Sequence, residues 1–233
     1  MDARVPTVER PTAISLRQVR HRYLAAVEGA PRPFELKVPA LSVGRGERVA
    51  VVGPSGAGKT TLIELLAGLQ VPTAGQVVVD GVELSSSPDA ARRAFRSTRL
   101  GLVFQDLQLL DYLSVFDNVL LPYRVHPTLE LGAAARLRAR QLLDEAGLAS
   151  VSGRRVGTLS RGERQRVAVC RALVTRPAVV LADEPTAHLD ARDTGRVLDL
   201  LFHRLQAEHT LVMVTHDSGL LHRFQRTLEL EAP

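Results

Sequence analysis

A chain of 233 residues with 45% hydrophobic residues can bury one substantial core, and its formal net charge is +5. The arginines are spread along the chain rather than gathered in one block, so we expect solvated helix faces and no nucleic-acid partner. A single cysteine excludes an internal disulfide, and neither a signal peptide nor an apolar run of the ~18 residues that cross a membrane is visible, so we expect a cytoplasmic location.

The first half of the chain predicts strands around one helix. Short strands with polar turns are expected over 12–50, and ERVAVVG at 47–53 is typical of a buried strand that enters a glycine loop. LIELLAGL at 62–69 has helical periodicity. QVVVDGVEL at 76–84 predicts a strand, an Asp-Gly turn and a second strand, and LGLVFQ at 100–105 predicts another strand.

The second half is predicted to be helical before it returns to strands. Helices are expected over 114–147 and again from the segment LSRGERQR at 159–166. AVVLADE at 178–184 is an apolar strand ending in two acids, and TLVMVTHD at 210–217 is a strand ending in polar residues. This alternation favours a parallel sheet with helices on both faces, with a separate helical lobe at about 106–160.

The stretch GPSGAGKT at 53–60 fits the phosphate-binding loop pattern, and it lies between a buried strand and a helix as that mechanism requires. Its glycines allow close backbone approach, so the loop amides and the helix N-terminus face a polyanion. Lys59 supplies charge at the β- and γ-phosphates, and the Thr60 hydroxyl can ligate Mg²⁺. The expected phosphate-binding residues are Gly53, Pro54, Ser55, Gly56, Ala57, Gly58, Lys59, Thr60 and Thr61.

Two acids end the apolar strand at 178–184. Asp183 is placed to hold Mg²⁺ through water, and Glu184 beside it could polarise an attacking water. The alternative is a pair of surface acids that merely ends a strand, which the phosphate loop upstream makes the weaker interpretation.

The segment LSRGERQR narrows the class of nucleotide-binding protein. Ser160 and Glu163 form a capping-box pattern, which by itself predicts only the start of a helix. Lying between the phosphate loop and the acidic strand, the segment also resembles the signature motif of ATP-binding cassette (ABC) ATPases. Further motifs that resemble those of this family are present along the chain in the expected order. Their key residues are Tyr23 in VRHRY, Gln105 in LVFQ, Asp190 at the end of EPTAHLD, and His216 in VTHD.

The resemblance covers nearly the whole chain and implies an α/β fold. That fold has a P-loop NTPase core of mostly parallel sheet with flanking helices, an N-terminal antiparallel β subdomain and an inserted α-helical lobe. The chain would be a single ABC ATPase domain over 1–233. Within it, the core and β subdomain would occupy about 12–105 and 161–233, and the lobe about 106–160.

The resemblance also implies a head-to-tail homodimer that encloses two ATP molecules with Mg²⁺. Each site would join the phosphate loop of one subunit to the signature helix of the other. The catalytic residues it implies are Glu184, His216 and Gln105. The metal ligands it implies are Thr60, Gln105 and Asp183. The remaining nucleotide contacts it implies are Tyr23 on the adenine, Ser160 and Gly162 on the γ-phosphate across the interface, and Asp190.

Two positions depart from the family pattern. Family members usually carry glycine where Arg161 stands, and often glutamine where Glu163 stands. Arg161 would either add a cation beside the γ-phosphate or point into solvent, whereas Glu163 suits the capping box.

The stretch at 100–122, followed by the signature segment, is similar to the lipoprotein-release and macrolide-export branch. That branch implies an ATPase, peripheral on the inner face of the cell membrane, that drives a separate integral membrane permease from its cytoplasmic face. The region 109–116 is the candidate docking site, with simple packing of the lobe as the alternative. Other interpretations are a cell-division ATPase that transmits force without transport, the ATPase subunit of a small-molecule importer, and a soluble nucleic-acid-associated ABC protein.

Overall fold

The computed structural model describes residues 11–23, 34–204 and 208–231, which contain two β-sheets. A four-stranded antiparallel sheet has the order β2-β1-β4-β5, and a five-stranded parallel sheet has the order β6-β7-β8-β3-β9. The antiparallel strands are β1 (Thr12–Arg22), β2 (Glu35–Gly44), β4 (Ala74–Val79) and β5 (Val82–Glu83). The parallel strands are β3 (Arg48–Val52), β6 (Leu100–Val103), β7 (Val179–Asp183), β8 (Thr210–Val214) and β9 (Arg226–Glu229).

The antiparallel sheet is built on two long strands. β1 has 11 residues and β2 has 10, and they pair from Thr12–Gly44 to Arg22–Glu35, so the expectation of short strands is wrong. Buried and exposed residues alternate along β2 from Leu36 to Pro39, and Pro39 is one of the exposed residues. Proline is tolerated there because β2 lies at the edge of the sheet and need not donate a hydrogen bond outward.

The parallel sheet confirms the strands predicted from apolar runs. Every residue of β7 and β8 is buried, as expected for strands covered on both faces. The strand β9 was not predicted, because its sequence RTLE is mostly exposed and gives no buried run. It forms through pairing with β3, from Val49–Arg226 to Val52–Glu229.

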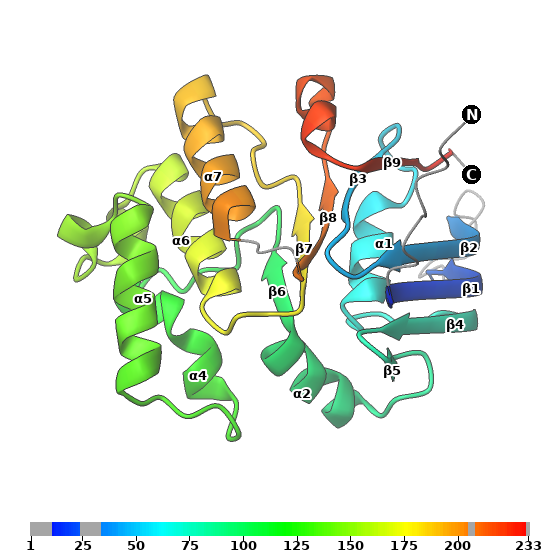
Figure 1. The fold of residues 1–233 in the computed structure, drawn as a ribbon, viewed down its shortest axis with the longest axis horizontal. Helices are drawn as coiled ribbons and strands as arrows, with labels where there is room; N and C mark the ends of the chain where they lie inside the picture. The colour runs from blue at the N-terminus through cyan, green and yellow to red at the C-terminus, as the bar shows by residue number, and fades with distance from the viewer. Residues whose placement is uncertain (1–10, 24–33, 205–207, 232–233) are drawn as a thin grey trace, which may run out of the picture.

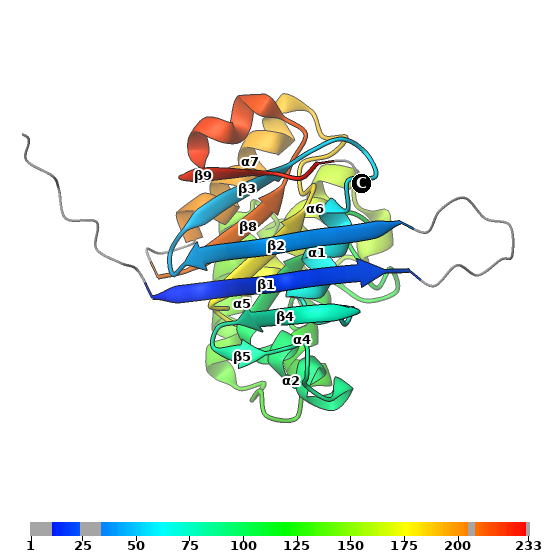
Figure 2. The same ribbon diagram turned by 90° about the vertical axis from the view of Figure 1, so that its right-hand side faces the viewer.

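The helices form layers around the sheets (Figure 1). Helix α1 lies between the antiparallel and parallel sheets, while α6 and α7 cover the opposite face of the parallel sheet and α5 packs outside α6. Figure 2 shows β1, β2 and β4 running across the molecule in front of α1. The helices are α1 (Lys59–Leu66), α2 (Asp89–Arg99), α3 (Val115–Val119), α4 (Leu121–Val125), α5 (Ala133–Glu145), α6 (Arg161–Leu173) and α7 (Ala191–Arg204), with short 3₁₀ segments at Ala149–Val151, Val156–Thr158 and Ser218–Arg223.

Within the described part of the chain, two hydrophobic clusters make the core. One joins the antiparallel sheet, α1 and one face of the parallel sheet, and the other joins the opposite face to α6 and α7. Helices α3 and α5 belong to this second cluster, so the helices expected over 114–147 are present but share their core with α6. The boundaries of the helical lobe therefore stay a prediction. No helix among the described residues is long and apolar enough to cross a membrane.

Candidate nucleotide site

The carboxyl ends of three neighbouring parallel strands meet at one edge of the sheet. Val214 of β8 pairs with Val51 of β3 on one side and with Asp183 of β7 on the other. Beyond these strands, the amide of Glu184 donates to the carbonyl of Val214 at 3.1 Å, and the amide of Thr215 donates to that of Val51 at 3.1 Å. The phosphate loop, the two acids and the VTHD segment therefore leave the sheet side by side, at the edge where parallel α/β sheets bind ligands.

The glycine loop wraps back over the start of α1. Lys59 is buried, and its ammonium donates to the carbonyls of Gly53 and Pro54, each at 2.9 Å. Gly58 has φ of 93°, and a Cβ there would lie 2.7 Å from the ring of Phe34, so only glycine fits this position. The loop thus holds a cation at its centre, with the N-terminus of α1 behind it.

Thr60 and Asp183 join the loop to the acidic strand. The Thr60 hydroxyl donates to Oδ2 of Asp183 at 2.8 Å, and Asp183 is 3% exposed. Burial raises the pKa of the Asp183 carboxyl above its ordinary value, although the Thr60 hydrogen bond and the charge of Lys59 act in the opposite direction.

This pair of oxygen ligands fits a magnesium ion bound together with phosphate. Mg²⁺ is commonly held by one or two carboxylates, with substrate phosphates and waters completing its shell. Among the described residues no group of three or more His, Cys, Asp or Glu side chains could hold a metal by itself, so the fit depends on the nucleotide. Thr60 and Asp183 are the residues that would hold the ion.

Glu184 and His216 also contact each other at this edge. The Nε2 atom of His216 lies 2.8 Å from Oε1 of Glu184, and the histidine side chain is 53% exposed. Glu184 has φ of 47°, in the left-handed region that non-glycine residues seldom adopt. Such strain is found at functional sites, where the backbone aims a side chain that a relaxed conformation would turn elsewhere.

Tyr23 lies against the first turns of α1. Its hydroxyl donates to Oε2 of Glu64 at 2.9 Å and is hydrogen-bonded to the Thr61 hydroxyl at 3.1 Å. Burial, as the largest cause, raises the pKa of the Tyr23 phenol. The tyrosine is 41% exposed, so a ring surface is available beside the phosphate loop. Glu64, which lies one helical turn beyond Thr60, is not among the residues predicted from the sequence.

Gln105 is exposed two residues beyond the end of β6. Because Val103 pairs with Ala182, this segment leaves the sheet at the same edge as Asp183. The Gln105 side chain forms no hydrogen bond with any other described residue. The structure therefore brings Gln105 to the correct edge without a contact that assigns its role.

The predicted capping box at the start of α6 is confirmed. The amide of Glu163 donates to the Ser160 hydroxyl at 3.3 Å, and the amide of Ser160 donates to Glu163 at 2.8 Å. The Ser160 backbone hydrogen bond is the main cause that lowers the pKa of Glu163. Arg161 donates to Nδ1 of His188 at 3.0 Å, a contact that was not predicted from the sequence.

Asp190 is linked to the signature segment through Asp193. Its Oδ1 atom accepts a hydrogen bond of 2.7 Å from the amide of Asp193, and the Asp193 carboxylate packs against buried Gly162. The contacts sort the predicted residues into two groups. Tyr23, the phosphate loop, Asp183, Glu184 and His216 make up one group, and Ser160, Gly162 and Asp190 make up the other.

Comparison with known proteins identifies the class. The model of the family described as "ABC transporter" matches residues 36–187, and the chain belongs to this family. The fold and the phosphate loop are those of its ATPases, so the chain is an ABC ATPase that binds and hydrolyses ATP.

The particular relatives are named lipoprotein-releasing system ATP-binding protein LolD. The protein from Xanthomonas oryzae pv. oryzae is 44% identical over 232 residues, which are 98% of this chain and 93% of that protein. The protein from Xanthomonas axonopodis pv. citri is 47% identical over 229 residues, which are 97% of this chain and 91% of that protein. The similarity to the lipoprotein-release branch is thereby confirmed.

Two solved structures are similar over almost the full length. The dimeric structure of MJ0796, a bacterial ABC transporter cassette, has a TM-score of 0.85 and 31% identity, covering 94% of each chain. A dimeric post-hydrolysis state of MJ0796 bound to ADP and Pi has a TM-score of 0.84 and 31% identity, covering 93% of this chain and 94% of that chain.

Proposed function

We propose that this chain is the ATPase subunit of a lipoprotein-releasing system, in which two copies close head-to-tail around two ATP molecules. Both copies would drive a separate integral membrane permease from the inner face of the cell membrane. The observation that carries the proposal is the sequence identity of 44–47%, over nearly the whole chain, with proteins named LolD. The division of the site residues into two contact groups supports the dimer.

The first contact group would bind the nucleotide within one subunit. Tyr23 would stack on the adenine, and the amides of 53–61 would surround the phosphates. Lys59 would turn from the carbonyls of the loop to the β- and γ-phosphates. Thr60 and Asp183, with Gln105, would hold Mg²⁺, which neutralises phosphate charge when it is bound.

Glu184 would orient the attacking water and accept its proton. His216, which contacts Glu184, would point to the γ-phosphate and stabilise the charge that develops there. Ser160, Gly162 and Asp190 would come from the other subunit, with the positive end of α6 behind the γ-phosphate. Catalysis would therefore depend mainly on positioning and charge neutralisation, as in other phosphoryl transfers.

The permease would dock on an apolar groove at the side of the molecule. This groove has a volume of about 310 Å³ and lies next to the candidate region 109–116. Within that region Leu109 and Phe116 pack partly on the core, which favours the packing interpretation for them, whereas Tyr112 is 70% exposed and free to contact a partner. The apolar residues that line the groove are Leu69, Leu100, Leu102, Phe104, Leu121, Pro122, Val125 and Ala172.

Affinity purification of a tagged Glu184→Gln variant from its native membranes, with ATP and Mg²⁺, tests the proposal. We expect mass spectrometry to identify a membrane protein with few spans and a large outer domain. The matched control is the Lys59→Ala, Glu184→Gln double variant, which should recover less of that protein. A many-span channel partner would instead favour an importer, and recovery of nucleic acid without a membrane protein would contradict the transporter assignment.

A further inference from the structure

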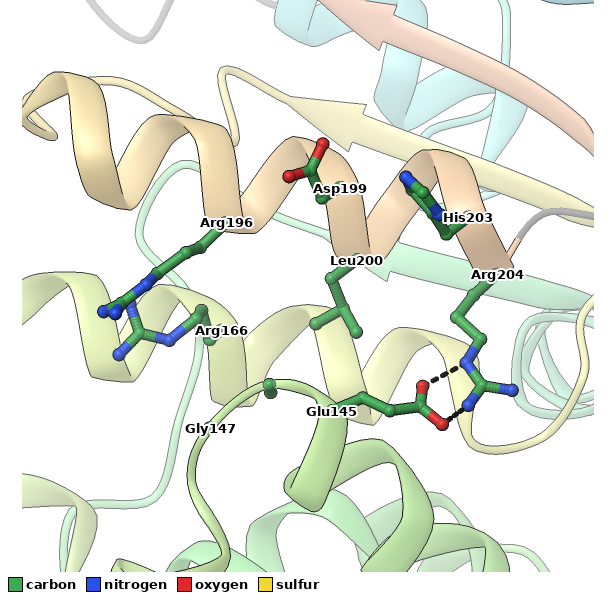
Figure 3. Close-up of a pocket in the computed structure, with 9 residues that line it drawn as sticks. Glu145, Gly147, Arg166, Arg196, Asp199, Leu200, His203 and Arg204 are labelled. Atoms are coloured by element: carbon green, nitrogen blue, oxygen red, sulfur yellow. Dashed lines mark hydrogen bonds and ion pairs between the residues drawn. The ribbon is translucent and has the colours of Figure 1, made fainter.

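A partly buried ion pair ties the signature segment to helix α7. Asp193 lies in the first turn of α7, and its Oδ1 atom accepts from Nη1 of Arg166 on α6 at 2.5 Å. Arg166 is 5% exposed, so this charge is held inside the protein. Figure 3 shows Arg166 and Arg196 pointing toward each other from α6 and α7, beside a cavity of about 730 Å³. Arg196 lies 3.7 Å from the same Asp193 oxygen.

The Asp193 carboxylate also occupies the space above Gly162. A Cβ at Gly162 would lie 1.9 Å from Oδ2 and 2.4 Å from Cγ of Asp193, far inside van der Waals contact. Glycine at this position therefore allows the carboxylate to rest directly on the backbone of the signature segment. Any side chain there would push α6 and α7 apart or displace the carboxylate.

The same residue fixes the loop before α7. Its amide donates to Oδ1 of Asp190 at 2.7 Å, so one residue contacts the signature glycine through its side chain and Asp190 through its backbone. A second link, from Arg161 to His188 at 3.0 Å, joins the same two segments. Residues 160–166 and 184–193 are thus fastened at two points, each across 27 positions of sequence.

Stability alone does not explain this arrangement. Nε of Arg166 is buried without a hydrogen-bond partner among the described residues, and an unsatisfied buried donor costs free energy. Apolar side chains of similar volume often stabilise a protein as well as a buried ion pair does. A charged pair whose carboxylate rests on a glycine instead specifies one relative position of the two segments.

We propose that Asp193, held by Arg166, is a positioning residue for ATP hydrolysis. It sets the distance and angle at which Ser160 and Gly162 approach the nucleotide of the partner subunit when the dimer closes. The inference rests on the proposed head-to-tail dimer. This positioning role differs from a purely structural role. Asp193 affects closure of the dimer and turnover of ATP rather than nucleotide binding by the phosphate loop, which Asp193 does not contact.

The test compares Asp193→Asn with Asp199→Asn. Both substitutions remove one carboxylate charge from α7, but Asp199 pairs with Arg223 at 3.5 Å rather than with Arg166. Three properties are measured for each: the Kd of the monomer for an ATP analogue, the kcat and KM of ATP hydrolysis, and ATP-driven dimerisation in the Glu184→Gln background. Thermal unfolding of each variant is recorded in parallel.

We expect Asp193→Asn to leave the monomer Kd within about twofold of wild type and to lower kcat roughly 10- to 100-fold, because small misplacements of a reacting group cost this much. Dimerisation should require roughly tenfold more protein. Asp193→Glu keeps the negative charge but moves the carboxylate, and it should lose less activity than Asp193→Asn. Asp199→Asn should match wild type.

Two results would overturn the inference. In the first, Asp193→Asn dimerises and turns over ATP like Asp199→Asn. In the second, its Kd for nucleotide weakens in step with its thermal stability, which is the behaviour of a residue that only supports the fold. If wild type itself neither hydrolysed ATP nor dimerised as Glu184→Gln, the proposed function would fail first, and no closure would remain for Asp193 to position.

Discussion

At the scale of single residues, Asp183 is a carboxylate that is almost fully buried. Its pKa is raised by burial, so the folded protein binds this proton more tightly than the unfolded chain does. The contribution of Asp183 to stability is therefore greatest at acid pH and declines as pH rises through the raised pKa. At neutral pH the ionised carboxylate destabilises the nucleotide-free protein until a cation approaches it.

Asp183→Asn should consequently raise thermal stability at pH 7 while abolishing Mg²⁺-dependent ATP hydrolysis. Each kcal/mol gained would raise Tm by roughly 2–4 °C in a chain of this length. The difference in Tm from wild type should narrow as pH falls toward the range where the carboxyl is protonated in both states. Melting curves of the variant and of wild type at several pH values without Mg²⁺ measure this, and a variant less stable than wild type at pH 7 would contradict it.

The two lysines of the chain offer a matched pair of substitutions. Lys59 is buried in the phosphate loop and donates to two loop carbonyls, whereas Lys37 has a side chain that is 63% exposed and pairs with Glu35 on the antiparallel sheet. Lys59→Ala should weaken ATP binding by at least roughly tenfold, since it removes the charge-assisted contact to the phosphates. Lys37→Ala should bind as wild type does, because surface ion pairs contribute little. Equal affinity of the two variants in a titration calorimeter would disprove the assignment of the loop.

At the scale of elements, the contact between α6 and α5 can be measured through the accessibility of one thiol. Cys170 on α6 is fully buried, and its thiol donates to the carbonyl of Leu142 on α5 at 3.4 Å. Burial raises the pKa of this thiol to about 12, so almost no reactive thiolate exists at pH 8.

We therefore expect Cys170, the only cysteine of the chain, to resist alkylation by iodoacetamide in the native state and to react fully in denaturant. The native labelling rate would report the opening of α6 from α5 rather than the reactivity of the thiol. Mass spectrometry of samples quenched over time gives this rate. Native labelling as fast as that of the denatured chain would show that the helix interface is open in solution.

The elements also show where sequence patterns suffice. β3, β7 and β8 could be predicted because their apolar runs are long enough to fill a sheet covered on both faces, and the motifs that follow them mark the site edge. The strand β9 could not be predicted, because only its pairing with β3 makes RTLE a strand. Asp193 was missed for a similar reason: its contacts with Arg166 and Gly162 cross 27 and 31 positions of sequence (193 − 166 and 193 − 162), and no local pattern indicates them.

At the scale of the whole molecule, the division of the site into two contact groups makes a prediction about mixed dimers. Lys59→Ala impairs the phosphate loop, and Gly162→Asp would impair the signature segment by placing a bulky acid against Asp193. Either variant alone would give a dimer with two defective sites. In a mixed dimer both defects would meet in one site, and the second site would combine an intact loop with an intact signature segment.

Mixing the two inactive variants in equal amounts should therefore restore ATP hydrolysis. Random pairing makes half of the dimers mixed, each with one intact site of two, so about a quarter of the wild-type rate is the upper expectation for a heterologous site shared between subunits. Steady-state phosphate release from the mixture, compared with each variant alone, measures the effect. Sites complete within one subunit would gain nothing from mixing, because every subunit in the mixture would still carry its own defect.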